Sequence, residues 1–254
     1  MIVLHDTMLV FRRAMRLSLR NPIWVILGLT QPVLYLSLFG PLLRRLPLSG
    51  ADSTAAENWR IFVPGLMVQL AMFGAAFVGF GLVAEWRAGV IERMRVTPAS
   101  RLALLLGRVL RDVVVLVVQA TILILVALPF GLRVSFGGAV LAVVLVAVLG
   151  AAFASLSYAA ALSLKSEDAL APLLNGIAIP LLLLSGILLP MSLAPGWLQA
   201  LADVNPLSHV VTGVRALFDV SGDAGEVWLA AAVTTGLVAI ALALGASVFR
   251  KESG

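Results

Sequence analysis

The sequence contains no cysteine and only two histidines, and charged residues make up just 12% of its 254 positions. The absence of cysteine excludes disulfides, thiolate metal sites and cysteine nucleophiles. Hydrophobic residues make up 61% of the chain, and the mean hydropathy is +1.07. A water-soluble fold of this composition would have too little polar surface to cover itself. The shortage of charge therefore excludes a soluble domain and indicates a single membrane domain over residues 1–254.

Catalytic and nucleotide-binding motifs are missing as well. The sequence has no GxxxxGK[ST] phosphate loop, no GxSxG and no HExxH, so neither ATP hydrolysis nor another enzymatic activity has visible residues to carry it. The excess of basic over acidic residues, 18 against 13, bears on membrane topology in such a chain and does not point to nucleic acid. We expect no metal site and no cofactor bound directly to this chain.

Six uncharged runs are each long enough for a helix of roughly 20 residues to cross the hydrocarbon. They cover 21–43, 61–84, 113–132, 134–164, 169–202 and 227–249. Prolines interrupt the fifth run, so we expect its span to end near Leu189. None of the six spans, with these bounds, contains Asp, Glu, His or Lys. A proton-driven carrier usually has such residues at depth, so secondary transport is disfavoured.

Basic residues fix the expected orientation. With six crossings, both termini and the second and fourth loops lie on one side, which holds thirteen Lys and Arg residues against five on the other. The positive-inside rule then makes both termini cytoplasmic. The first run is too long for the apolar core of a signal peptide, so we do not expect cleavage.

Two segments on the cytoplasmic side have amphipathic patterns. Residues 6–20 place Met8, Phe11, Met15 and Leu19 on one face beside a row of arginines, which predicts a helix lying along the membrane surface. It serves either as an anchor or in partner docking.

The loop at 85–111 repeats apolar side chains every four residues at Trp86, Val90 and Met94. This pattern predicts a short helix with an exposed apolar ridge, which lipid or another protein would have to cover. The alternative is a solvated hairpin. Thr97 and Pro98 can begin a second helix that continues into the third span, and on it Arg108 and Asp112 could pair at a spacing of four.

Residues 190–220 follow the fifth span on the opposite side. Two short helical patterns, at 196–203 and 207–218, are separated by Asn205 and Pro206. Neither is long enough to cross, so we expect re-entrant or interfacial helices, with a plain outer loop as the alternative. Trp197 would also suit an ordinary interface anchor.

Uncharged polar side chains lie inside the predicted spans and have two interpretations. They can line a path for an amphipathic substrate, or they can form interhelical hydrogen bonds, which is the commoner use. The residues are Gln31, Gln69, Gln119 and Asn175, with Ser155 and Tyr158.

Three segments together resemble one family, the type-2 permeases of ATP-binding cassette exporters, and within it the daunorubicin-resistance-like membrane subunits. They are the basic N-terminal helix, the stretch EWRAGVIERMRVTPASR leading through GRVLRD into the third span, and PGWLQALADVNPLSHVVTGVR before the last span. The resemblance covers nearly the whole chain. The expected fold is therefore an all-α integral membrane protein with six transmembrane helices, an N-terminal interfacial helix, a cytoplasmic coupling helix and re-entrant helices before the last span.

The resemblance also implies function, partners and site residues. It implies a permease in a bacterial inner membrane, paired with a second permease copy or a sibling, and bound to two cytoplasmic ATPase subunits that carry ATP and Mg²⁺. The N-terminal helix would be the connecting helix, and the segment before the last span would cap the outer end of the path through Trp197, Asn205, Pro206 and Arg215. The ATPase-coupling role would fall on Glu85, Trp86, Gly89, Val90, Glu92, Arg93, Met94, Arg95, Thr97 and Pro98.

Export of an amphipathic drug, lipid or glycoconjugate is the function this resemblance implies. A passive facilitator or channel is the first alternative, because it too needs no energy-coupling residues. A non-transporting membrane scaffold is the second.

Overall fold

The long apolar runs form helices, the structure that satisfies every backbone hydrogen bond within its own segment. The computed structural model describes residues 2–21, 23–43, 54–89, 101–187, 191–219 and 222–251. All regular elements in these ranges are helical. They are α1 (Ile2–Arg20), α2 (Ile23–Leu43), α3 (Ala55–Ala76), α4 (Val78–Arg87), α6 (Arg101–Ala127), the 3-10 turn η1 (Leu128–Phe130), α7 (Phe136–Leu164), α8 (Glu167–Leu183), the 3-10 turn η2 (Met191–Leu193), α9 (Gly196–Val204), α10 (Pro206–Phe218) and α11 (Ala224–Lys251).

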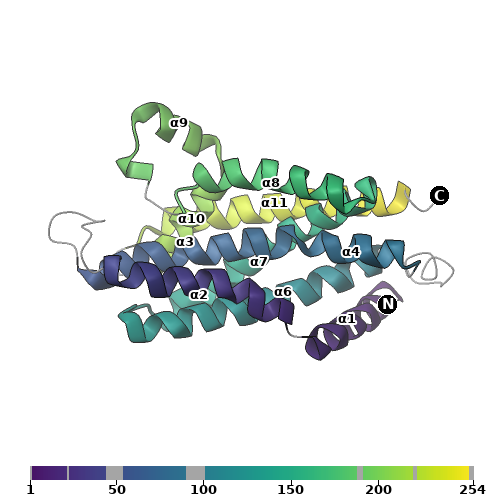
Figure 1. The fold of residues 1–254 in the computed structure, drawn as a ribbon. Coiled ribbons are helices and arrows are strands. Elements are labelled where there is room, and N and C mark those ends of the chain that lie inside the picture. The colour runs from purple at the N-terminus through teal and green to yellow at the C-terminus, as the bar shows by residue number, and fades with distance from the viewer. Residues whose placement is uncertain are drawn as a thin grey trace.

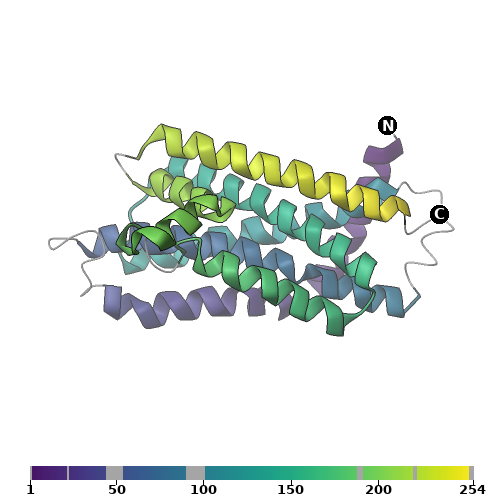
Figure 2. The same cartoon turned by 90° about the horizontal axis from the view of Figure 1, so that it is seen from above.

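The long helices lie side by side along one axis, and shorter ones occupy the two ends of the bundle (Figure 1). α1 lies at one end, together with the last turns of α4 and α11, and we call this the α1 end. α9 projects from the opposite end, which we call the α9 end. The view from above agrees that α1 and the end of α11 share one end of the bundle (Figure 2).

α3 and α7 form the centre of the bundle. α7 packs against α11, α6, α3, α4 and α10, and its buried side chains include Tyr158 and Leu149. In an apolar stretch of 18 residues within the span that contains α3, 67% of the residues are buried, against 17% in the corresponding stretches of α2 and α11. The outer helices therefore present apolar faces such as Ile26 and Ile240 to their surroundings, as expected of helices in contact with lipid.

Among the described residues, five helical stretches are long and apolar enough to cross a membrane. They are Val25–Leu42, Ala56–Arg87, Leu102–Phe130, Phe136–Leu164 and Ala224–Val248. The predicted fifth span corresponds to α8, whose helix has 17 residues with two prolines inside, fewer than the roughly 20 needed for a crossing. The sixth crossing therefore stays a prediction.

The end of α8 corrects one sequence-based boundary. The fifth span was expected to end near Leu189, but its helix ends at Leu183. The chain turns at once through residues 184–186, where Gly186 has φ of 73°, a conformation that side chains other than glycine rarely adopt. This turn brings Ile187 against Gly65 of α3, so closely that a Cβ on Gly65 would lie 2.3 Å from the Ile187 carbonyl oxygen.

The second span is broken where the sequence predicts a continuous helix. α3 ends at Ala76 and α4 starts at Val78. The hydroxyl of Ser157 in α7 inserts at this break, where it donates a hydrogen bond to the Ala76 carbonyl and accepts one of 3.0 Å from the Gly79 N–H. Inserted side chains of this kind are a recognised cause of helix kinks, because they satisfy backbone groups that the interruption frees.

Candidate functional site

Ion pairs hold the last turn of α4 to two neighbouring helices at the α1 end. Glu85 pairs with Arg108 of α6, and the Arg87 guanidinium lies 3.4 Å from a carboxylate oxygen of Glu167 at the start of α8. The Arg108 side chain is largely buried, whereas Arg87 and Glu167 are exposed, so the first pair is the less screened of the two. A displacement of the chain after α4 would therefore reach α6 and α8 directly.

Three of the ten predicted coupling residues lie in the described part of the chain. Glu85 and Trp86 belong to the end of α4, and the helix stops at Arg87, after which Gly89 takes φ of 67°. The ammonium nitrogen of Lys165 lies over the Trp86 ring, 5.8 Å from the centroid of that ring. The other seven predicted coupling residues, Val90, Glu92, Arg93, Met94, Arg95, Thr97 and Pro98, lie outside the described residues.

α6 also contains a buried carboxylate, Asp112, whose burial was not predicted from the sequence. Asp112 is only 3% exposed; it pairs with the neighbouring Arg111 at 3.1 Å and accepts a 2.5 Å hydrogen bond from the Tyr158 hydroxyl of α7. We expected the third span to begin after Asp112, on a helix continuing from the cytoplasmic loop, where Arg108 and Asp112 could pair. α6 is indeed continuous from Arg101 into this span, and its candidate span starts at Leu102, but Arg108 pairs with Glu85 on α4.

Asp112 therefore lies within the candidate span Leu102–Phe130, although it precedes the span predicted from the sequence at 113–132. The polar hydroxyl of Tyr158 in an otherwise apolar run was the available signal for a buried partner, because a Tyr hydroxyl in an interior normally finds one. Among the described residues, no group of three or more His, Asp or Glu is arranged to hold a metal ion.

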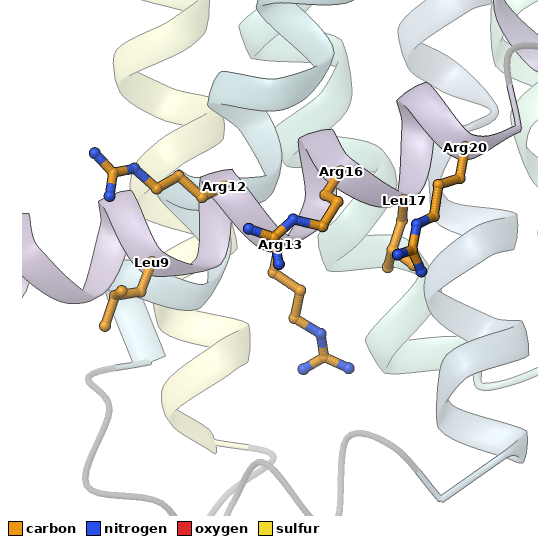
Figure 3. Close-up of a pocket in the computed structure, with 6 residues that line it drawn as sticks. All are labelled: Leu9, Arg12, Arg13, Arg16, Leu17 and Arg20. Atoms are coloured by element: carbon orange, nitrogen blue, oxygen red, sulfur yellow. The ribbon is translucent and has the colours of Figure 1, made fainter.

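α1 forms as predicted over 6–20 and packs on α6, but its apolar face is divided. Gly107 of α6 lies so close to α1 that a Cβ there would lie 2.7 Å from the Val10 Cβ. Phe11 is partly covered, whereas Leu19 of the same predicted face is 74% exposed. Figure 3 shows the exposed basic residues beside two leucines around a small hollow of about 340 Å³. Its lining residues are Leu9, Arg12, Arg13, Arg16, Leu17 and Arg20.

The close approach at Gly107 gives a testable prediction about this contact. We expect Gly107→Val to lower the free energy of unfolding by about 1–3 kcal/mol, because overpacking a close contact forces backbone shifts. Thermal unfolding of the detergent-solubilised protein would measure the loss. Gly176→Val is the matched control, since the space around that helical glycine is open. Equal effects of the two substitutions would contradict a tight α1–α6 contact.

At the α9 end, Asn205 and Pro206 begin α10 where the sequence placed the break between two short helices. The Asn205 side chain accepts a hydrogen bond from the Leu207 N–H, and its amide donates one of 2.8 Å to the Leu181 carbonyl of α8. Proline at the first helical position has no N–H to leave unsatisfied. Asn205 therefore both caps α10 and attaches it to the end of α8.

Arg215 attaches the other end of α10 to the bundle. Its guanidinium donates a hydrogen bond of 3.0 Å to the Ile61 carbonyl of α3 and one of 2.7 Å to the Gly186 carbonyl. Burial lowers the pKa of Arg215 to about 10, so the side chain remains charged at neutral pH. Trp197, the other predicted outer residue, is 67% exposed on α9, which projects from the bundle (Figure 1).

The four predicted substrate-path residues are divided between the interior and the surface. Gln69 and Gln119 are buried, and Gln119 donates a 2.9 Å hydrogen bond to the Val25 carbonyl of α2. Gln31 and Asn175 are exposed and bond within their own helices. Gln119 thus shows the interhelical use that the sequence left open. Contact of any of the four with substrate stays a prediction.

An apolar bundle with polar ties at both ends and five candidate spans is a multi-pass membrane protein. The profile of the ABC-2 type transporter family matches residues 5–218, and the chain belongs to that family. It is similar to the daunorubicin resistance ABC transporter permease protein DrrB1 of Streptomyces coeruleorubidus, with 28% identity over 95% of this chain and 84% of the relative.

Two further relatives extend this similarity. The putative transport permease ycf38 of Cyanophora paradoxa is 28% identical over 78% of this chain and 69% of the relative. The probable doxorubicin resistance ABC transporter permease protein DrrC of Mycobacterium tuberculosis is 23% identical over 83% and 75%. The family is one of transporter permeases, so the chain is the membrane subunit of an ABC transporter and not itself an enzyme.

Proposed function

We propose that this chain forms the membrane path of an ABC exporter for an amphipathic drug, lipid or glycoconjugate, driven by ATP that separate subunits hydrolyse. The names of two relatives, which refer to daunorubicin resistance and to probable doxorubicin resistance, support an amphipathic substrate. The apolar spans, with a few amides such as Gln69 and Asn175, suit such a compound better than a fully polar one.

The proposed topology has six crossings, with both termini cytoplasmic in a bacterial inner membrane. α8 provides the sixth: it starts beside Arg87 at the α1 end and finishes near Asn205 at the α9 end. α1 and the last turns of α11 lie at the same end of the bundle (Figures 1 and 2), as cytoplasmic termini require. The excess of Lys and Arg predicted for that side supports this orientation.

The observation that carries the proposal is the attachment of α4 to its neighbours. The chain segment after α4 would bind a cytoplasmic ATPase, and Glu85–Arg108 and Arg87–Glu167 would pass its displacement on to α6 and α8. Two ATPase subunits would carry ATP and Mg²⁺, and a second permease copy, identical or a sibling, would complete the path. α1 would lie along the membrane surface beside the ATPase.

Substitutions in the predicted coupling ridge test this proposal. We expect Val90→Asp with Met94→Asp to reduce the amount of co-purified ATPase at least tenfold, because two carboxylates in an apolar contact would cost more than about 1.4 kcal/mol. Leu193→Asp with Val204→Asp is the matched control, since both residues are exposed at the α9 end. Undiminished co-purification with the ridge variant would show that lipid, and not the ATPase, covers the ridge.

Vesicle transport separates the exporter from a passive facilitator. The permease and its ATPase, reconstituted together, should move an anthracycline against its gradient only when ATP is hydrolysed. A facilitator would equilibrate the compound without ATP and leave the ATPase rate unchanged.

A further inference from the structure

A long apolar groove lies between α6 and α7. Its volume is about 700 Å³. Its lining runs from Val113 along α6 to Leu128 in η1, and from Val134, just before α7, to Ala151 in α7; the α6 side is about 22 Å long at 1.5 Å per residue. The groove therefore covers a large part of the roughly 30 Å hydrocarbon thickness.

The lining of this groove is almost entirely apolar. Of its sixteen lining residues, all but Thr121 and Ser135 are aliphatic or aromatic. The Thr121 hydroxyl donates to the Val117 carbonyl, and the Ser135 hydroxyl accepts from the Gly138 N–H. Because a buried polar group costs free energy unless it is hydrogen-bonded, this surface favours a hydrocarbon chain as its occupant.

Two arginines lie at the end of the groove nearest α9. Arg133 is exposed and directly precedes Val134 of the lining. Arg60 of α3 donates a 3.0 Å hydrogen bond to the Arg133 carbonyl, so both residues lie at the same level of the bundle. Arginine near a membrane surface attracts anionic headgroups. A phosphate at this level would lie directly above the groove.

From this arrangement we propose that the α6–α7 groove binds one anionic phospholipid, with a hydrocarbon tail along Val140 and Val144 and its phosphate beside Arg133. Aliphatic walls alone would accept the tail of any lipid. The arginines Arg133 and Arg60 at the end of the groove add a preference for an anionic headgroup over a zwitterionic one. This lipid site depends on the membrane embedding of the chain and not on the ATPase.

Native mass spectrometry of the purified chain, titrated with phosphatidylglycerol or with phosphatidylcholine of the same tails, tests the site. We expect Arg133→Gln to weaken phosphatidylglycerol binding up to about fivefold, since an exposed ion pair contributes up to about 1 kcal/mol. Phosphatidylcholine binding should not change, and Arg133→Lys should retain the preference. An Arg133→Gln variant that keeps the full phosphatidylglycerol preference would overturn the headgroup assignment.

A second pair of variants tests the tail. Val144→Phe narrows the groove and should weaken both lipids about tenfold, whereas Leu141→Phe should weaken neither. The two positions are matched on α7, at 51% and 52% exposure, but only Val144 lines the groove. Equal losses from both variants would overturn the tail assignment. A shift from dimer to monomer mass in Val144→Phe would assign the groove to a second copy of the chain and overturn the proposal.

Discussion

Replacing Asp112 by Leu should lower the free energy of unfolding by about 3–5 kcal/mol, the usual effect of removing one partner from a buried ion pair. The substitution leaves the Arg111 guanidinium, which is mostly covered, without its carboxylate. It also removes the acceptor of the Tyr158 hydroxyl, and with it a hydrogen bond that joins α6 to α7. Chemical unfolding of the solubilised protein would measure the change.

Two control variants identify the cause of this loss. Arg111→Leu together with Asp112→Leu should recover much of the stability, because replacing both residues leaves no unpaired charge in the interior. Asp203→Leu on exposed α9 should change it by less than about 0.5 kcal/mol, as surface substitutions usually do. If Asp112→Leu were as mild as Asp203→Leu, the carboxylate would have no role in holding α6 to α7.

Replacing Arg215 by Leu is expected to loosen the attachment of α10 to the bundle, at a cost of about 3 kcal/mol from lost charge-assisted hydrogen bonds. The Ile61 and Gly186 carbonyls would lose their donor. Hydrogen exchange should rise in α10 and in residues 184–187, while α1 and α6 retain their protection. This local pattern follows because the bonds of Arg215 lie at the α9 end alone.

The matched comparison for Arg215 is another arginine that bonds across helices. Arg87→Leu removes an exposed ion pair, which is typically worth no more than about 1 kcal/mol. Arg215→Lys should retain only part of the stability, because an ammonium group cannot reach two carbonyls with the fixed fork of a guanidinium. If Arg215→Leu lowered the free energy of unfolding no more than Arg87→Leu does, the proposed attachment of α10 by Arg215 would be wrong.

Local patterns in the sequence were sufficient for much of the helical layout. The periodicity of 6–20 predicted α1, and Asn205 followed by Pro206 predicted the start of α10. Helix propensity, capping and apolar periodicity are set by neighbours within a few residues, so a single sequence contains them. The coupling ridge and the substrate path remain predictions.

Features that depend on contacts between distant residues could not be predicted in this way. The break at Phe77 requires Ser157, which is 78 residues from Gly79 along the chain. The sequence placed Asp112 on a helix just before the third span, but it could not show that Tyr158, 46 residues away along the chain, donates a hydrogen bond to it. The family resemblance gave the class of protein but none of these pairings.

The interruption at Phe77 turns α4 into a short rigid arm with a pivot. α4 has 10 residues and is about 15 Å long, so a swing of 10° about the interruption would carry Arg87 sideways by roughly 2.6 Å. At this pivot the Ala76 carbonyl and the Gly79 N–H bond to the Ser157 hydroxyl, so a swing there strains fewer helical hydrogen bonds than it would in an unbroken helix. The end of α4 can therefore be displaced while α3, in the centre of the bundle, stays in place.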